Sequence, residues 1–301
     1  MSDPDDSGQQ EQPRLAESDQ WNLRLWGKCE ETHPDQLQLT DTEIQAILDS
    51  IFAQDYEVRQ KTIDRLTKLG APLSKILVDT MVKNTTNNTL LFQLTYALEA
   101  IGKVAIKPLM EELNKIQELK TTLDVAQLEN ITETLIRLND KSAAPILAKH
   151  IKTANDEISK ITQSANGDIN NPNITKKISF QQSTRLKLHD LLGEMKASDG
   201  LDDLLVLLGD GRKRVHEDIV EALCKMGDKR ALVPLIRLYS VESSVSELGA
   251  RYIRLTFREI ARMEKIAKND PIFRELNPDE KKILNNLFPG SRLEARNHPK
   301  E

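Results

Sequence analysis

Apolar residues recur at helical spacing along most of the chain, in pairs of short segments separated by a turn. The clearest pair spans residues 215–239, where Val215, Ile219 and Leu223 share one face of a helix and a second apolar segment follows. Gly227 lies between the two segments, at the place where a glycine in the left-handed conformation commonly ends a helix. This pattern predicts a helical hairpin.

The same pattern occurs four more times upstream. The residues expected to end the first helix of each hairpin are Gly70, Gly102, Asn139, Lys196 and Gly227. The interval from Asn139 to Lys196 is wider than the others and contains a segment rich in Asn, with Gly and Pro, which are residues typical of turns. We therefore predict a repeat array over residues 54–267, with an inserted loop at about 155–180.

The segments that flank the array carry signs of capping helices. Thr40 and Glu43 have the spacing of a capping box and predict a helix that runs through Phe52, within an N-terminal cap segment at 21–53. Asn277 and Glu280 predict a last short helix, within a C-terminal cap helix and tail at 268–301. Such flanking helices cover the ends of a repeat array.

Residues 215–239 resemble a HEAT repeat of the short bacterial kind, which is also found in phycobilin lyases. The matching residues are Val215, Ala222, Leu223, Met226, Gly227, Asp228, Arg230, Ala231, Pro234 and Leu235. The resemblance, with the weaker upstream copies, implies an all-α fold, an α-α superhelix that forms a HEAT/armadillo-like solenoid of about five to six helical hairpins. Proteins of this fold share packing positions and not a common activity.

Charge is distributed unevenly along the chain. The formal net charge is −5, and the first twenty residues hold six acidic side chains against Arg14, so the remainder is electrically neutral. A neutral body disfavours proteins that wrap nucleic acid by bulk electrostatics. We expect residues 1–20 to be an acidic disordered tail.

Motifs that would support catalysis or metal binding are missing from the sequence. It contains no phosphate-binding loop, no H-E-x-x-H, no C-x-x-C and no G-x-S-x-G. Cys29 and His33 are one helical turn apart, but a third and a fourth zinc ligand are missing, and His216 with Cys224 makes at most a dyad. His189 and Asp190 are neighbours on a helix and face different ways. We therefore predict no enzyme activity, no metal and no cofactor.

Four arginines form the most informative charged feature. Arg251, Arg254, Arg258 and Arg262 share an arc of about 80° on one predicted helix, and this set is called the arginine ridge. Tyr252, Ile253 and Phe257 are among the apolar residues on the opposite, buried face. Guanidinium groups suit carboxylate or phosphate partners. Three interpretations of the ridge stay open: a solvated face partly offset by neighbouring glutamates, a site for an acidic or phosphorylated partner, or a nucleic-acid contact.

Trp21 and Trp26 form the only patch that contains tryptophan, directly after the acidic segment. They either dock onto the first hairpin as a cap or form a short linear motif that a partner captures, because aromatic anchors dominate interface energies.

Taken together, these features predict a non-catalytic scaffold or adaptor for protein–protein interaction. The expected partner is another protein, which could carry an acidic or phosphorylated segment. The alternatives are a phycobilin lyase-like protein that handles a chromophore and, ranked lower, a helical-repeat protein that binds nucleic acid. The sequence has no long apolar span and begins without a secretory pattern, so we expect a cytoplasmic protein with no membrane association.

Overall fold

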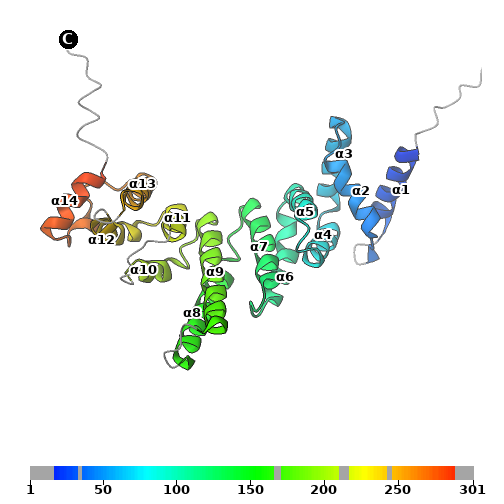
Figure 1. Ribbon diagram of the computed structural model, residues 1–301. Coiled ribbons are helices and arrows are strands. Elements are labelled where there is room, and N and C mark those ends of the chain that lie inside the picture. Colours follow the sequence, from blue (N-terminus) through cyan, green and yellow to red (C-terminus); the bar gives the residue numbers. More distant parts are fainter. Residues whose placement is uncertain (1–16, 33–35, 166–170, 210–216, 243–245, 289–301) are drawn as a thin grey trace, which may run out of the picture. The chain divides into compact units, whose positions relative to one another are not determined.

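The computed structural model describes residues 17–32, 36–165, 171–209, 217–242 and 246–288. Within these ranges the regular structure is helical and no β-strand occurs, which confirms the all-α prediction. The chain divides into two compact units, Met1–Pro108 and Leu109–Glu301. The helices are labelled in Figure 1.

In the first unit the helices are α1 Glu17–Glu31, α2 Asp41–Ile51, α3 Tyr56–Leu69, α4 Ala71–Lys83, α5 Asn88–Ile101 and the 3-10 turn η2 Lys103–Ala105, and α6 Ile106–Lys115 crosses into the second unit. The second unit continues with α7 Thr122–Arg137, α8 Ala144–Ser164, α9 Pro172–Glu194, α10 Leu201–Gly209, α11 Glu217–Met226, η3 Lys229–Ala231, α12 Leu232–Glu242, α13 Glu247–Met263, η4 Pro271–Phe273 and α14 Pro278–Leu287.

The predicted turns are confirmed by the backbone. Positive φ angles occur within the described ranges at Gly70, Gly102, Asn139, Lys196, Gly227 and Lys265. Five of these residues are the predicted helix ends, and Lys265, with φ 53°, ends α13 in the same way. A residue in the left-handed conformation lets the chain turn back after a helix and lets backbone N–H groups donate hydrogen bonds to the last carbonyl groups of that helix. At Asn139, for example, the N–H donates to the Ile136 carbonyl at 2.9 Å.

Within each unit the first helix of one hairpin contacts the first helix of the next. The pair α3–α5 does so in the first unit, and the pairs α7–α9, α9–α11 and α11–α13 do so in the second. The second helices α10, α12 and α14 also contact in succession. Turns are linked as well, because the Lys141 ammonium of the α7–α8 turn donates to the Lys196 carbonyl of the α9–α10 turn at 2.9 Å.

Leucine and isoleucine fill the space between these helices. The fully buried residues include Leu66, Leu94, Leu98, Leu135, Leu188, Leu223 and Ile253. Each such side chain contributes about 1.5–3 kcal/mol of transfer free energy when it leaves water. The periodic apolar positions of the sequence therefore form the core between neighbouring helices.

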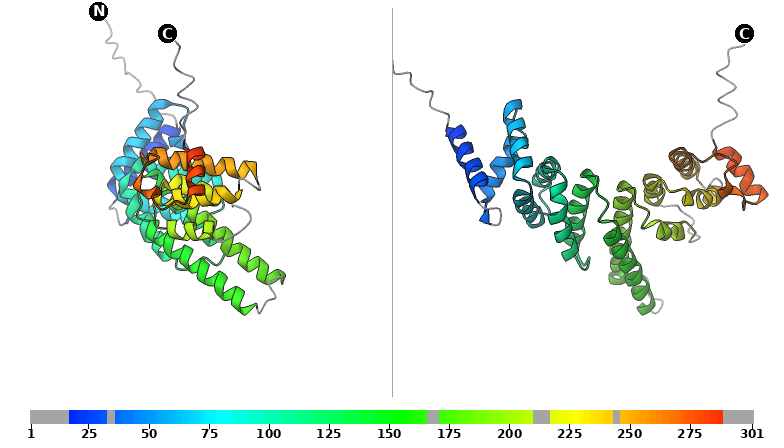
Figure 2. Two further views of the ribbon diagram at one scale, coloured as in Figure 1. Left: turned by 90° about the vertical axis from the view of Figure 1, so that its left-hand side faces the viewer. Right: turned by 180° about the vertical axis from the view of Figure 1, so that it is seen from behind.

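The loop expected at 155–180 is wrong, because helix α8 extends to Ser164 and α9 begins at Pro172. These helices, of 21 and 23 residues, lie side by side (Figure 2). Their asparagines have structural roles: Asn171 caps α9 by accepting from the Asn173 N–H, and Asn155 lies inside α8 and binds Asp203 and Arg185. Residues 166–170 lie outside the described ranges.

The flanking helices largely follow the prediction. Capping boxes are present at Thr40 with Glu43 and at Asn277 with Glu280. Helix α1, however, begins at Glu17, inside the segment expected to be a disordered tail to residue 20, and residues 1–16 lie outside the described ranges. Among the described residues no single helix is long and apolar enough to cross a membrane. Helix α5 and residues 103–115 reach that length and apolarity only when they are counted as one segment, and this segment is bent by 114°.

Candidate interaction surface

Helix α13, which carries the arginine ridge, packs against α11 and α12 (Figure 1). Ser246 starts it by accepting a hydrogen bond from the Gly249 N–H at 3.0 Å. The buried face consists of Ala250, Ile253, Thr256, Phe257, Ile260 and Ala261. Ile253 and Phe257 are buried as predicted, whereas Tyr252 is 42% exposed because it lies at the edge of this face.

Two of the four ridge arginines are used within the protein. The half-buried Arg258 donates from Nε to the Leu287 carbonyl at 2.8 Å, and this carbonyl belongs to the last residue of α14. Arg262 forms an ion pair with Glu259, one turn away on the exposed side of α13. The ridge is therefore not a uniform row of four available guanidinium groups.

The other two arginines, Arg251 and Arg254, form no ion pair within the part of the chain that the structure describes. Next to them, Leu248 is 59% exposed and Leu255 is 54% exposed, and Tyr252 lies between these two leucines. The spacing of four and three residues places the three apolar side chains on one stripe of the helix. Leu248, Arg251, Tyr252, Arg254 and Leu255 are called the α13 surface.

The C-terminal half of α13 repeats the register of α11. Arg258 and Arg262 precede the turn residue Lys265 by the same distances at which Val220 and Cys224 precede Gly227. Val220 is buried, and Cys224 hydrogen-bonds to Thr256 of α13. The side of α13 that carries Arg258 and Arg262 thus corresponds to the side of α11 that contacts α13. By the same register the α13 surface aligns with residues 210–217, of which 210–216 lie outside the described ranges.

Of the two tryptophans, Trp26 is 2% exposed, and the Arg65 guanidinium lies over its ring at 5.3 Å from the ring centroid. Its helix α1 contacts α3. For Trp26 this geometry supports the interpretation as a cap. The side chain of Trp21 lies outside the described part of the structure.

An exposed aromatic cluster in the first unit was missed at the sequence level. The Phe52 ring lies 5.9 Å from that of Phe92 and 5.3 Å from that of Tyr96, measured between centroids. All three side chains are exposed. The spacing of four residues between Phe92 and Tyr96, on the side of α5 opposite its leucines, indicates part of this cluster, but the contribution of Phe52 depends on how α2 packs.

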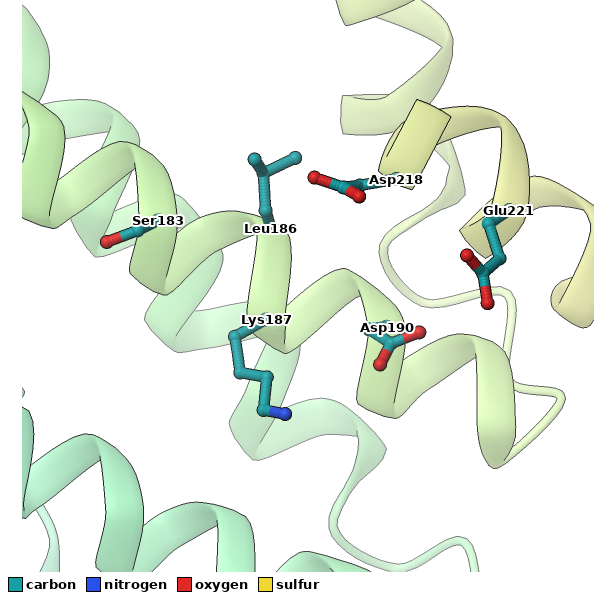
Figure 3. A pocket seen from close by; sticks show the side chains of 6 residues that line it. All are labelled: Ser183, Leu186, Lys187, Asp190, Asp218 and Glu221. Carbon is teal, nitrogen blue, oxygen red and sulfur yellow. The ribbon is translucent and has the colours of Figure 1, made fainter. Parts of the chain in front are cut away.

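A depression of about 320 Å³ lies between α9 and α11 (Figure 3). Its lining residues are Ser183, Leu186, Lys187, Asp190, Asp218 and Glu221. At its edge Lys225 forms ion pairs with Asp190 at 2.5 Å and Glu221 at 3.2 Å. Burial alone lowers the pKa of Lys225, but hydrogen bonds to these carboxylates outweigh it and raise the pKa. The amine is therefore an ammonium at neutral pH and has no lone pair for nucleophilic chemistry.

His189 and Asp190 point to different partners, as predicted. Asp190 binds Lys225, whereas His189 is 1% exposed and its Nε2 lies 3.1 Å from Asp203 of α10. Asp203 also accepts from Asn155, which in turn accepts from Arg185 at 2.6 Å. This polar network joins α8, α9 and α10 inside the protein, so it holds the hairpins together and is closed to a substrate.

The cysteines are also placed in poorly reactive surroundings. Burial, reinforced by Glu43, raises the pKa of Cys29 to about 11, and burial raises the pKa of Cys224. Both are therefore thiols and not thiolates at neutral pH. The described ranges contain no group of three or more His, Cys, Asp or Glu side chains arranged to hold a metal ion, and His33 and His216 lie outside those ranges.

A scan against models of known protein families finds no match, and a search of the curated proteins finds none either. The resemblance to HEAT repeats consequently stays a hypothesis that rests on the residues of the sequence.

Proposed function

We propose that the protein is a non-catalytic interaction scaffold, a solenoid of HEAT-like helical hairpins that presents helix surfaces to another protein. The succession of contacts among α7, α9, α11 and α13 supports the solenoid, because stacked hairpins pair like helices in order. Arrays of this kind expose long surfaces that are suited to a helix or an extended segment of a partner.

One observation carries the proposal: the α13 surface combines exposed apolar side chains with two arginines that have no ionic partner in the described ranges. Apolar contact supplies affinity, and unpaired cations select the sign of the partner. The partner segment is therefore amphipathic and acidic, with its apolar side chains on Leu248 and Leu255 and its carboxylates near Arg251 and Arg254.

Comparative affinity capture from a lysate of the native source tests this proposal. Wild-type protein and the double variant Arg251→Glu/Arg254→Glu serve as baits, and the captured proteins are quantified by mass spectrometry. The double variant should lose a defined set of partners by about tenfold or more, because each reversed charge replaces attraction by repulsion.

The matched control is Lys149→Glu/Lys152→Glu, which makes the same change of charge at exposed positions of α8. It should retain the partners that the α13 variant loses. Equal capture by all three baits would show that the α13 surface takes no part in binding.

A further inference from the structure

A second depression, of about 400 Å³, lies on the terminal hairpin where the turn after α13 meets η4 and α14. Its lining residues are Lys268, Asn269, Asp270, Phe273, Arg274, Lys281, Leu284 and Asn285. None of the residues of the α13 surface belongs to it. Sequence patterns did not reveal it, because Lys268, Arg274 and Lys281 come from three different segments.

The three cations of this depression are not neutralised by neighbouring carboxylates. The acidic residues at the start of α14 are already engaged, because Asp279 pairs with Lys282 at 2.8 Å and Glu280 pairs with Arg237 at 2.9 Å. Within the described ranges Lys268, Arg274 and Lys281 form no ion pair. Three positive charges therefore surround one hollow.

One carboxylate also lines the depression, that of Asp270. It caps η4 by accepting a hydrogen bond from the Ile272 N–H at 3.0 Å. The balance of the lining is thus three cations against one anion. A ligand that carries two negative charges matches this balance, whereas a single carboxylate leaves positive charge uncompensated.

The remaining lining residues indicate what accompanies the charge. Phe273 and Leu284 are buried and contribute an apolar floor, and Asn269 and Asn285 are exposed amides that donate and accept hydrogen bonds. A hollow of this volume is larger than a phosphoryl group. The ligand accordingly brings apolar atoms for the floor and peptide-like polar groups for the amides.

We propose that this depression binds a phosphorylated side chain of a partner protein segment. A phosphate monoester carries close to two negative charges at neutral pH and three acceptor oxygens, and Arg274 can bind two of these oxygens at once. The flanking residues of the segment lie over Phe273 and Leu284. The proposal rests on the scaffold function only for the source of the phosphate, because phosphate binding itself can be tested without a partner.

The first test uses the full-length protein with inorganic phosphate and with a degenerate peptide library that has a fixed central phosphoserine. Inorganic phosphate should shift the NMR side-chain amide signals of Asn269 and Asn285. The phosphoserine library should be retained on immobilised protein, and the same library with serine should not. Retention should weaken with added salt, because the Debye length falls from about 10 Å at 0.1 M to about 3 Å at 1 M.

Two variants connect binding to the depression. Lys268→Gln/Arg274→Gln/Lys281→Gln should weaken binding of the phosphoserine library by about 100-fold, since each lost cation removes a charge-assisted contact. Asp270→Asn should strengthen it, because the carboxylate is removed while an asparagine can still cap η4. The control Lys149→Gln/Lys152→Gln/Lys176→Gln lowers the net charge equally at exposed positions of α8 and α9 and should bind like wild type.

Four outcomes would overturn the proposal. Equal retention of the serine and phosphoserine libraries would show that the phosphoryl group is not recognised. Equal losses in the cation variant and its control would show a general charge effect. Binding of inorganic phosphate without retention of the phosphoserine library would assign the depression to free phosphate. The absence of any phosphate-induced shift would remove the site, and the scaffold function would still stand or fall on the α13 surface.

Discussion

Replacing Arg258 and Arg262 one at a time tests whether the arginine ridge is divided between structural and available residues. Arg258→Gln removes a charge-assisted hydrogen bond of 2.8 Å from Nε to the Leu287 carbonyl. A carbonyl at the end of a helix has no partner within that helix, so its loss of a donor is not compensated locally. Arg262→Gln breaks only an exposed ion pair with Glu259.

The two substitutions, Arg258→Gln and Arg262→Gln, should lower the stability of the protein by clearly different amounts. A hydrogen bond to a charged group contributes about 1.5–3 kcal/mol, and the half-buried position of Arg258 places the loss near the lower end, at about 1.5 kcal/mol. When the free energy of unfolding falls by about 2 kcal/mol for each 1 M of urea, this loss lowers the urea midpoint of unfolding by about 0.7 M. The Arg262–Glu259 ion pair is exposed to solvent, which screens it, so Arg262→Gln should lower the midpoint clearly less than Arg258→Gln does.

The assay is urea unfolding followed by far-ultraviolet circular dichroism, with Arg251→Gln as a third variant. Arg251 has no ionic partner in the described ranges, so its substitution should leave the midpoint within about 0.2 M of wild type. Equal midpoints for Arg258→Gln and Arg262→Gln would refute the structural role of Arg258. A large loss in Arg251→Gln would show that the α13 surface is packed within the free protein.

Three further predictions concern the core, the polar network and a buried thiol. Gly193→Ala should lower the free energy of unfolding by about 2 kcal/mol, because a Cβ there would lie 2.9 Å from Lys225 Cβ and 3.1 Å from the Ala222 carbonyl oxygen. The control Gly27→Ala, whose Cβ would have no neighbour within 4 Å, should not destabilise the protein. Equal effects of the two substitutions would contradict the close approach of α9 and α11. Burial raises the pKa of Asp203, but hydrogen bonds from His189 and Asn155 and the charge of Arg185 lower this pKa overall. The contribution of Asp203 to stability is therefore present above about pH 4 and is lost as the pH falls further. An acid-unfolding curve that is unchanged in Asp203→Asn would argue against this contribution. Cys29, with a pKa of about 11, should react with iodoacetamide at pH 8 about a hundredfold more slowly in the folded protein than in urea, as read by mass spectrometry, and equal rates would contradict its burial.

Much of the fold could be predicted because the helix periodicity and the turn residues are local properties of the chain. Gly70, Gly102, Asn139, Lys196 and Gly227 all adopt the left-handed conformation expected of them. The prediction of a loop at 155–180 is wrong because asparagines, which are typical of turns, here cap a helix and form hydrogen bonds between helices. Asn155 sits within a helix because its side chain has partners on α9 and α10, and these partners depend on tertiary packing.

The candidate sites were less predictable, for a physical reason. Helical spacing correctly placed Arg251 on an exposed face, but it could not show that Arg258 reaches the end of α14, 29 residues further along the chain. The cation-lined depression has the same origin. Lys268 and Lys281 belong to different segments, and only the packing of the terminal hairpin brings them to one hollow.

Site-specific photo-crosslinking tests whether the α13 surface binds a partner protein. Benzoylphenylalanine is placed at position 252, in the middle of that surface, or at position 206, where Val206 of α10 is 70% exposed. In cells of the native source the probe at 252 should form a discrete adduct that disappears with Arg251→Glu/Arg254→Glu and is not formed from 206. The absence of an adduct at position 252, or an adduct that persists when both arginines are reversed, would show that the α13 surface does not bind a partner in this way.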